Sequence, residues 1–559
     1  MDFILINFFY YLILIAILGY GFFFNRFFFS NIENYGNKNS DLGFIGLSGI
    51  FFLILISYLT NFFFSHNEIF NLFLLIVGLF FFIFYFIKYF SQINFLFLAL
   101  IFLILSISFF LFKNHDDFGY YHFPFAYHLT QNKLIFGMGN FDHGWRTPSS
   151  IFYLHSLFYL PNIKYYLFHI VPVYILGFSN LIILKKIFSY SKKKLDFIFY
   201  LYFLTFVFIN IFFSRLSEHG GDLSGQVLAF LMILKILEIT NLNEYQKKKY
   251  LEQVVLLLLI IITLKTFFVL YLVFFIYVSY LFYKKSFFLD TILNYKIISV
   301  SLLTFFFLVF SNFSSTGCII YPVEFLCFEN LSWAIKKNEV ISASNWYELW
   351  SKAGASPDYR VANTDNYIQN FNWIKNWFEK YFFNKVSDTL FGIFFICSIF
   401  LLLFFNSKER KKIKKIKFIY FLIIILLIEW FVKHPALRYG GYTLISLVIF
   451  IPISVYMHKF KNTFSSKYKI IIFLIIITFT YFIGKNSYRI HKEITKYNYS
   501  PLKKPFFFVG ENYFRYEENL NFLILKHENC KNKWQIDCEN LTPKLKYTLG
   551  YKIFYKINN

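Results

Sequence analysis

The chain has 559 residues, of which 58% are hydrophobic and only 15% are charged, and its mean hydropathy is +0.53. Such a composition excludes a soluble globular protein and predicts a polytopic membrane protein. The net charge of +24 does not indicate nucleic-acid binding, because the basic residues occur in short clusters between apolar segments, which is typical of topology signals.

Apolar segments long enough to cross a bilayer, about 20 residues each, recur along the chain. Four of them, at 3–24, 43–64, 69–91 and 94–113, form the N-terminal membrane spans, residues 1–113. The first has neither the basic start nor the small-residue cleavage site of a signal peptide, so we expect it to remain a membrane helix. Few charges lie between these segments, and the sequence leaves their orientation open.

Residues 114–164 form the first large outer loop, which begins with the adjacent carboxylates Asp116 and Asp117 and also contains His122 and Arg146. Neighbouring residues do not share a face of a helix, so one aspartate can point into a cavity while the other caps the backbone or meets a second ligand. Two carboxylates this close need a cation, a metal ion or a proton between them. The alternative is a solvated loop with an ordinary helix N-cap.

The same loop has an apolar spacing that is typical of a helix lying along the membrane surface. The residues with this spacing are Phe118, Tyr121, Phe125 and His128. We therefore expect an interfacial helix in the first large outer loop.

The central membrane spans occupy residues 165–312. Lysine-rich connections between them are typical of the cytoplasmic side, and they lie at 185–194, 247–249 and 284–285. A second polar loop contains Glu218, His219 and Asp222. One span separates each of the two polar loops from the first lysine cluster, so both loops are predicted on the outer side.

Lys265 interrupts an apolar run between two of the central spans. An ionisable residue in such a run is a functional candidate by default. The alternative is that Lys265 only marks the end of a helical hairpin.

Residues 313–385 form an outer loop rich in tryptophan, and a loop of this length is usually functional. Its tryptophans either anchor the loop at the membrane interface or stack on sugar rings. Cys318 and Cys327 lie close together in this loop, as do Cys530 and Cys538 nearer the C-terminus. Both pairs are disulfide candidates, because both are predicted outside the cytoplasm, where oxidation persists.

The C-terminal membrane spans, residues 386–484, are interrupted by an outer connection that contains Lys433, His434 and Arg438. A small extracytoplasmic tail, residues 485–559, follows them. All basic clusters then agree with one topology. We expect an all-α, polytopic transmembrane helical bundle of about fourteen spans, with both ends outside.

Four groups of polar residues are thus predicted on one side of the membrane. Their carboxylates suit proton abstraction or the binding of a divalent cation, Mg²⁺ or Mn²⁺, with Asp116 and Asp222 as candidate ligands. Their basic side chains suit phosphate binding; the candidates are Lys265, Lys433, His434 and Arg438. The alternatives are membrane-flanking anchors for the basic residues and a tight turn with solvated charges at 218–222.

Three stretches carry a resemblance to a known family: the pair Asp116-Asp117, the sequence Tyr121-His122-Phe123-Pro124 that follows it, and residues 218–226. Together they resemble the GT-C superfamily of membrane glycosyltransferases, which includes protein O-mannosyltransferases and aminoarabinose transferases. The resemblance implies an enzyme of the bacterial inner membrane. Such an enzyme would transfer a sugar from a polyprenyl-phosphate donor to a lipid, glycan or protein on the outer face.

The resemblance also implies roles for particular residues. Asp116 or Asp117 would be the catalytic base. Glu218 and Asp222 match the family's second acidic position and would help to hold a metal ion or orient the acceptor. Apart from the resemblance, His122, Arg146 and His219 in the same two polar loops are also candidates for binding substrate or metal. Three additional spans precede the Asp-Asp loop here, the Trp-Trp-Asp signature of oligosaccharyltransferase is absent from the sequence, and the outer tail is short, so the donor and the acceptor stay open.

Two other functions fit a membrane protein of this kind. A transporter or flippase for a lipid-linked glycan predicts charges in the middle of spans and access from both sides. A non-catalytic scaffold predicts that the Asp116-Asp117 pair lies far from Glu218 and Asp222. If the two groups share a metal ion or a substrate, they should lie within roughly 10 Å of each other.

Overall fold

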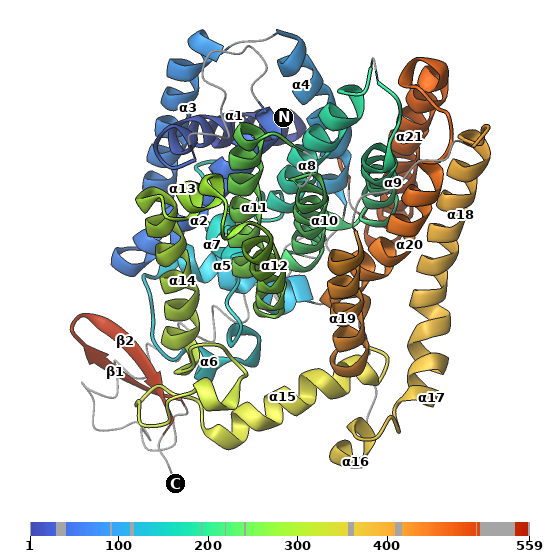
Figure 1. Ribbon diagram of the computed structural model, residues 1–559. Helices are drawn as coiled ribbons and strands as arrows, with labels where there is room; N and C mark the ends of the chain where they lie inside the picture. The colour runs from blue at the N-terminus through green and yellow to red at the C-terminus, as the bar shows by residue number, and fades with distance from the viewer. Residues whose placement is uncertain are drawn as a thin grey trace, which may run out of the picture.

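The computed structural model describes residues 2–29, 41–89, 92–111, 117–191, 193–218, 220–239, 242–355, 361, 363–408, 416–498, 500–502 and 543–556. Most of these residues are helical, and the long helices run side by side through the body of the molecule (Figure 1). The chain begins with four apolar helices; they are α1 (Asp2–Phe27), α2 (Leu42–Phe63), α3 (Glu68–Tyr89) and α4 (Gln92–Ser106). A short 3-10 turn, η1 (Ile107–Phe110), ends this part.

Glycines let α1, α2 and α3 approach one another closely. A Cβ atom at Gly49 of α2 would lie only 1.9 Å from the Ile17 carbonyl oxygen of α1, and one at Gly19 of α1 would lie 2.0 Å from the Gly78 carbonyl oxygen of α3. Helices in lipid associate through such small residues, because apolar side chains gain little from leaving an equally apolar solvent. Backbone contact therefore holds this part of the bundle together.

The first large outer loop folds into short helical segments. These are the π-helical turn η2 (Phe118–His122), α5 (Phe123–Gln131), α6 (Met138–Phe141), the 3-10 turn η3 (His143–Trp145) and α7 (Ser150–Ser156). A helix does form where an interfacial one is expected, but Phe118, Phe125 and His128 are buried within the protein. The apolar spacing predicted a helix correctly and did not reveal that protein, rather than lipid, covers its apolar face.

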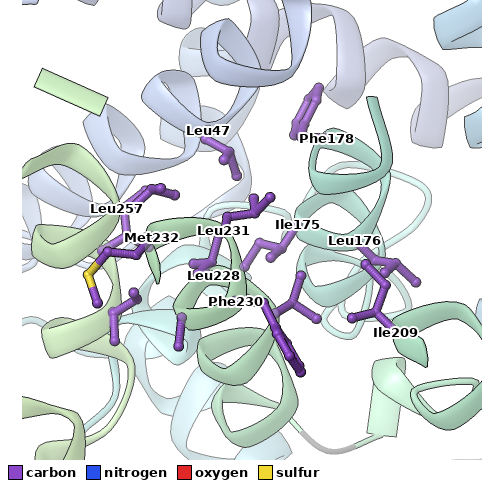
Figure 2. Close-up of a cluster of buried hydrophobic side chains, with 14 of the residues drawn as sticks. Leu47, Ile175, Leu176, Phe178, Ile209, Leu228, Phe230, Leu231, Met232 and Leu257 are labelled. Atoms are coloured by element: carbon purple, nitrogen blue, oxygen red, sulfur yellow. The ribbon is translucent and has the colours of Figure 1, made fainter. Parts of the chain in front are cut away.

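The central part of the chain forms the core. Its elements are α8 (Val171–Phe188), α9 (Phe197–Phe212), η4 (Leu216–Glu218), α10 (Gly221–Ile239), α11 (Glu244–Leu264), η5 (Thr266–Tyr271), α12 (Leu272–Phe282), α13 (Ser286–Ile292) and α14 (Tyr295–Thr316). Every residue of α10 is buried. Figure 2 shows Leu228, Phe230 and Leu231 of α10 packed among side chains of its neighbours. A helix apolar on all sides belongs inside a bundle, and α10 is the centre of this one.

The remaining chain adds elements at one end of the bundle and along its side. They are η6 (Glu324–Leu326), α15 (Lys337–Lys352), α16 (Thr364–Ile368), α17 (Ile374–Trp377), the π-helical η7 (Phe378–Val386), α18 (Ser387–Leu403), α19 (Lys417–Lys433), η8 (Leu437–Tyr439), α20 (Gly441–Met457) and α21 (Phe464–Tyr497). Figure 1 shows α15 lying across the ends of the long helices instead of parallel to them. Helix α21 continues to Tyr497, into the segment expected to be the tail.

The tail contains a β-hairpin, so the expected all-α fold is wrong in this detail. Strands β1 (Lys544–Thr548) and β2 (Tyr551–Tyr555) pair in antiparallel fashion. Phe136 of the first outer loop forms a parallel bridge with Ile553 and accepts a hydrogen bond at its carbonyl from the Phe554 amide, 2.9 Å away. The end of the chain is therefore docked on the first outer loop.

The helices are compatible with a membrane protein. Within the described residues, seven helices are long and apolar enough to cross a bilayer; they are Phe3–Phe27, Leu42–Phe63, Glu68–Tyr85, Val171–Phe188, Tyr295–Thr316, Ile374–Leu403 and Phe464–Tyr497. Several of them expose large apolar side chains, such as Ile69 and Phe80 of α3, which suits contact with lipid. The total of about fourteen spans stays a prediction.

Buried charges of α10 are compensated near its C-terminal end. Glu238 accepts a hydrogen bond from Lys186, with 3.1 Å between Nζ and Oε2. The Lys235 ammonium lies 4.4 Å from the centre of the Tyr250 ring, and the rings of Phe44 and Tyr202 are also close to it. Burial of a charge is tolerated when such partners replace water.

The glycine contacts lead to a stability prediction. In a Gly49→Ala variant the new methyl group collides with the backbone of α1, so α1 and α2 must move apart at a cost of about 1–3 kcal/mol. We expect a lower melting temperature of the detergent-solubilised protein.

Gly484→Ala is the matched control. Gly484 lies in α21, where an added Cβ meets nothing within 4 Å. Alanine favours a helix over glycine by about 1 kcal/mol, so this variant should melt at the same or a higher temperature. Equal melting of Gly49→Ala and the wild type would contradict the close approach of the two helices.

Candidate functional site

Four charged side chains from distant segments meet at one end of the bundle, and we call them the charge cluster: Asp117, Asp222, Lys265 and Arg438. The Arg438 guanidinium donates from Nε to Asp222 Oδ2 at 2.6 Å and from an Nη to Asp117 Oδ2 at 2.8 Å. The Lys265 Nζ forms an ion pair with the other oxygen of Asp222, also at 2.8 Å. Two carboxylates and two cations thus balance one another within a single network.

Each member of the charge cluster sits at an end or a break of a helix. Asp117 precedes η2, and Asp222 lies in the first turn of α10. Lys265 has an extended backbone between α11 and η5, which interrupts the apolar run at this point. Arg438 lies in η8, between α19 and α20. These positions let polar groups gather beyond the apolar helices.

Gln226, one turn after Asp222 on α10, holds the η8 connection in place. Its amide nitrogen donates to the carbonyl oxygens of Leu437 and Arg438 at 3.2 and 3.1 Å, and its amide oxygen accepts from the Thr443 amide at 3.2 Å. The backbone turns at Gly440, whose φ of +96° is in the left-handed region that glycine adopts readily. Helix α10 therefore fixes both the side chain and the backbone of Arg438.

The charge cluster is partly covered. The Asp222 side chain is only 1% exposed, whereas Asp117 is 24% and Arg438 22% exposed. Burial opposes the charge of Arg438, but the carboxylates of Asp222 and Asp117 outweigh it and raise the pKa of the guanidinium above its ordinary range. The network consequently stays charged. The Asp222 carboxylate is buried, and the Asp117 carboxylate is accessible.

Aromatic side chains, one of them from helix α15, cover part of the charge cluster. The Arg438 guanidinium lies 5.5 Å from the centre of the Trp350 ring and 6.0 Å from that of Tyr439. Burial, with the nearby charge of Asp117, raises the pKa of Tyr121, which keeps this phenol protonated. Aromatic faces stabilise a cation and exclude water from its surroundings, so the rings of Trp350 and Tyr439 cover part of the charge cluster.

Arg146 belongs to a second polar group. Its Nε donates to the Gly139 carbonyl at 3.0 Å, and its two terminal nitrogens donate to the Tyr321 hydroxyl at 3.3 Å and to Glu339 at 2.7 Å. Lys556, just after β2, pairs with the same Glu339 at 2.9 Å. This group joins the first outer loop, α15 and the tail.

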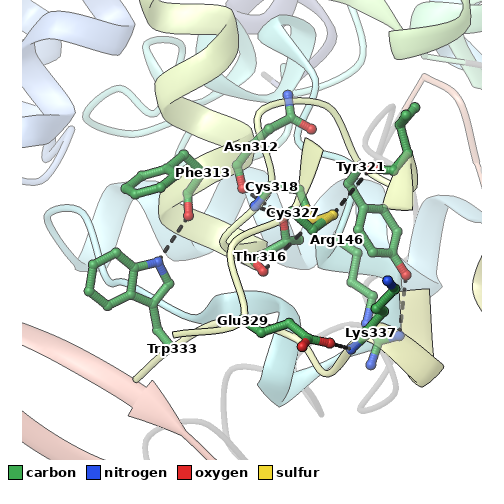
Figure 3. Close-up of a disulfide and its surroundings, with 11 residues drawn as sticks. Arg146, Asn312, Phe313, Thr316, Cys318, Tyr321, Cys327, Glu329, Trp333 and Lys337 are labelled. Atoms are coloured by element: carbon green, nitrogen blue, oxygen red, sulfur yellow. Dashed lines mark hydrogen bonds between the residues drawn. A yellow bond between two sulfur atoms is a disulfide. The ribbon is translucent and has the colours of Figure 1, made fainter. Parts of the chain in front are cut away.

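A disulfide between Cys318 and Cys327 closes the loop that carries Tyr321. Figure 3 shows Arg146 reaching the Tyr321 hydroxyl beside this disulfide. Trp333, in the same loop, donates from its indole nitrogen to the Phe313 carbonyl at 3.0 Å. The disulfide therefore braces the loop next to the Arg146 group.

Some of the residues singled out in the sequence lie apart from the charge cluster. Lys433 is exposed and pairs with Glu348 at 3.5 Å. His122 is buried and packs against Phe152. His434 lies against the Tyr439 ring, and burial lowers its pKa, which disfavours the cationic form that binds phosphate.

Other predicted residues cannot be placed. Asp116, His219, Cys530 and Cys538 lie outside the described residues, and only the backbone of Glu218 is described. A metal ion bound by Asp116 and Asp222 stays a prediction. Both oxygens of Asp222 already contact cations, and the described part of the chain has no group of three or more His, Cys, Asp or Glu side chains that could hold a metal.

Sequence reasoning missed the contributions of α15 and of the tail. Trp346 and Trp350 are four residues apart, a helical spacing that could have revealed one face of a helix. Gln226 ended the stretch that carries the family resemblance, but its hydrogen bonds could not be read from the sequence. No pattern in the sequence indicated that Lys556 pairs with Glu339.

A family model described as a domain of unknown function, DUF8201, matches residues 1–445. The chain belongs to this family. The matched region of this DUF8201 member includes all four residues of the charge cluster and ends before α21 and the hairpin. Neither the curated proteins nor the solved structures give a match.

The charge cluster leads to a prediction for Arg438→Gln. This change leaves Asp222 buried with Lys265 as its one remaining basic neighbour in the cluster, and removal of one partner from a buried pair costs about 3–5 kcal/mol. We expect a clear loss of thermal stability in detergent. Lys433→Gln is the control, since an exposed ion pair contributes about 0–1 kcal/mol. Similar melting of both variants would show that Arg438 does not hold the loops together.

The Arg146 group leads to a pH prediction. Burial alone raises the pKa of Glu339, but Lys556 and Arg146 outweigh it and lower that pKa. The ion pairs of Glu339 therefore stabilise the docked tail in full when the pH is above the ordinary glutamate pKa of about 4.3. This stabilisation is lost as the pH falls through the lower pKa that Glu339 has in the folded protein.

Amide hydrogen exchange of residues 543–556 measures this effect. We expect protection at neutral pH and faster opening in acid, after correction for the intrinsic exchange rate. A Glu339→Gln variant should open more readily at neutral pH and show less additional change in acid. The same acid dependence in wild type and variant would exclude Glu339 as the responsible group.

Proposed function

We propose that this protein is a GT-C-type glycosyltransferase of the bacterial inner membrane. It transfers a sugar from a polyprenyl-phosphate donor to a lipid, glycan or protein acceptor on the outer face. The observation that carries this proposal is the charge cluster, in which an accessible carboxylate, Asp117, lies against the cation Arg438. The two polar loops with carboxylates, which a scaffold would keep apart, meet here through Arg438.

The proposed topology places the charge cluster outside. About fourteen spans, counted from the lysine-rich connections, put η2, the start of α10, the α11–η5 break and η8 on the same side. The short helices α9, α12 and α20 and the buried helices α10 and α11 belong to this count. The buried charges of α10 lie near its two ends and its middle is apolar, whereas a transporter predicts charges in the middle of spans, so this arrangement supports an enzyme.

In the proposed reaction, Arg438 and Lys265 bind the phosphate of the donor. Arginine forms strong, directional hydrogen bonds with phosphate oxygens. As the phosphate replaces Asp117 at Arg438, the Asp117 carboxylate becomes available as a base. The sealed Asp222 keeps both cations in position.

Asp117 then accepts the proton of the acceptor hydroxyl. The acceptor oxygen forms a bond with the anomeric carbon, the bond between that carbon and the phosphate oxygen breaks, and the leaving phosphate keeps its negative charge against Arg438 and Lys265. The members of the cluster thus have separate roles, with Asp117 as base, Arg438 and Lys265 as phosphate ligands, and Asp222 as a positioning residue.

The proposal predicts the effect of Asp117→Asn. Loss of a general base lowers the rate by about 10²- to 10⁴-fold, and the isosteric amide preserves the fold. We expect that deletion of the gene removes one sugar from surface glycans or lipids, detected by mass spectrometry, and that wild type but not Asp117→Asn restores it.

Asp388→Asn, at the exposed start of α18, is the matched control and should restore the sugar fully. Full complementation by Asp117→Asn would overturn the assigned base. Accumulation of a lipid-linked intermediate in the deletion, cleared equally by Asp117→Asn, would instead favour a flippase.

A further inference from the structure

An open depression of about 500 Å³ lies beside the Arg146 group. Its lining residues are His143, Arg146, Asn338, Glu339, Ser342, Ala343 and Trp346. They come from η3 and the residue that follows it in the first outer loop, and from the first ten residues of α15. The depression is therefore formed where α15 crosses that loop.

The depression has an aromatic surface. Trp346 is 45% exposed, whereas Trp145, Trp373, Trp377 and Trp430 are buried. Its ring is fixed by His143, with ring centres 5.1 Å apart and planes at 79°. A fixed, accessible indole suits the apolar C–H face of a pyranose ring, and it costs little conformational entropy on binding.

Polar groups surround this aromatic surface. Arg146 and Glu339 hold each other at 2.7 Å, so the guanidinium and the carboxylate are oriented before any ligand arrives. The Asn338 amide and the Ser342 hydroxyl add donors and acceptors, and each carboxylate oxygen can accept more than one hydrogen bond. Sugar hydroxyls need both kinds of partner, which a purely basic or purely acidic site does not provide.

The charges around the depression balance. Arg146 and Lys556 face the carboxylates of Glu339 and Asp142. Burial, assisted by Arg146, lowers the pKa of His143, so its imidazole is neutral at neutral pH. A site without excess charge favours an uncharged ligand over a uronic acid or an amino sugar.

Helix α15 connects the depression with the charge cluster. Trp346 lines it, and Trp350, four residues further along α15, covers Arg438. Four helical residues span about 6 Å, which is close to the length of one sugar ring. Tyr347 lies between them, with Tyr121 and Tyr439 in its surroundings. One face of α15 thus runs from the depression to the arginine that pairs with Asp117.

We infer that this depression binds a neutral pyranose ring, stacked on Trp346 and hydrogen-bonded by Arg146, Asn338 and Glu339, and that it serves as the acceptor subsite. The second half of this inference rests on the proposed function. The acceptor is accordingly a neutral glycan or a neutral glycoside of a lipid or protein.

Saturation-transfer NMR with the protein in lipid nanodiscs tests the binding. The probes are methyl glycosides of neutral hexoses, N-acetylhexosamines and hexuronic acids. We expect signals from at least one neutral glycoside, with affinity about three- to tenfold lower in Trp346→Ala, as the loss of one aromatic contact implies. Trp346→Phe keeps a ring and should retain most of the affinity, which separates loss of stacking from loss of folding.

Phe325→Ala is the control, because Phe325 is 85% exposed on the neighbouring η6 and does not line the depression. Its binding should equal that of wild type. Absence of any neutral signal, signals from hexuronides alone, or equal affinity in Trp346→Ala would overturn the inference.

The same experiments separate this inference from the proposed function. If glycoside binding does not depend on Trp346 while Asp117→Asn still abolishes sugar transfer in cells, the acceptor subsite is wrong and the transferase stands. If binding depends on Trp346 while deletion of the gene changes no glycan, the depression is a sugar site and the transferase is wrong.

Discussion

The ion pairs of Arg438 hold together one end of the helical bundle. One guanidinium bridges Asp117 of the first outer loop and Asp222 of α10, and Asp222 in turn holds Lys265. A charge removed from water needs partners of this kind, because desolvation costs several kcal/mol per ion. Segments that are far apart in the sequence are consequently fixed in one arrangement, and the covering helix α15 is placed by its contact with the same arginine.

Helix α10 connects the two ends of the bundle. One end carries Asp222 and Gln226, the other end carries Lys235 and Glu238, and the part between them is apolar and fully buried. The polar groups at each end form hydrogen bonds and ion pairs with neighbouring segments instead of with water. A displacement of α10 along its axis would break contacts at both ends, so this helix sets the position of the site relative to the rest of the membrane domain.

The sequence could predict most of the charge cluster and little of what surrounds it. Asp117, Asp222, Lys265 and Arg438 were all candidates, because the alternation of apolar spans and lysine-rich connections assigns all four to the same predicted side. Arg146 was also a candidate but pairs elsewhere, with Glu339. Its partner depends on how the segment that contains Glu339 folds over the bundle, and no periodicity or charge pattern encodes that path. The docked hairpin was missed for the same reason, since strand pairing between distant segments leaves no local signal.

The bridge between Phe136 and Ile553 has a consequence for biosynthesis. The loop that contains Phe136 is synthesised well before the strand that pairs with it, because most of the helices lie between the two in the sequence. Edges left unpaired in the meantime are open to incorrect pairing. This surface can therefore be completed only after the intervening helices have been made.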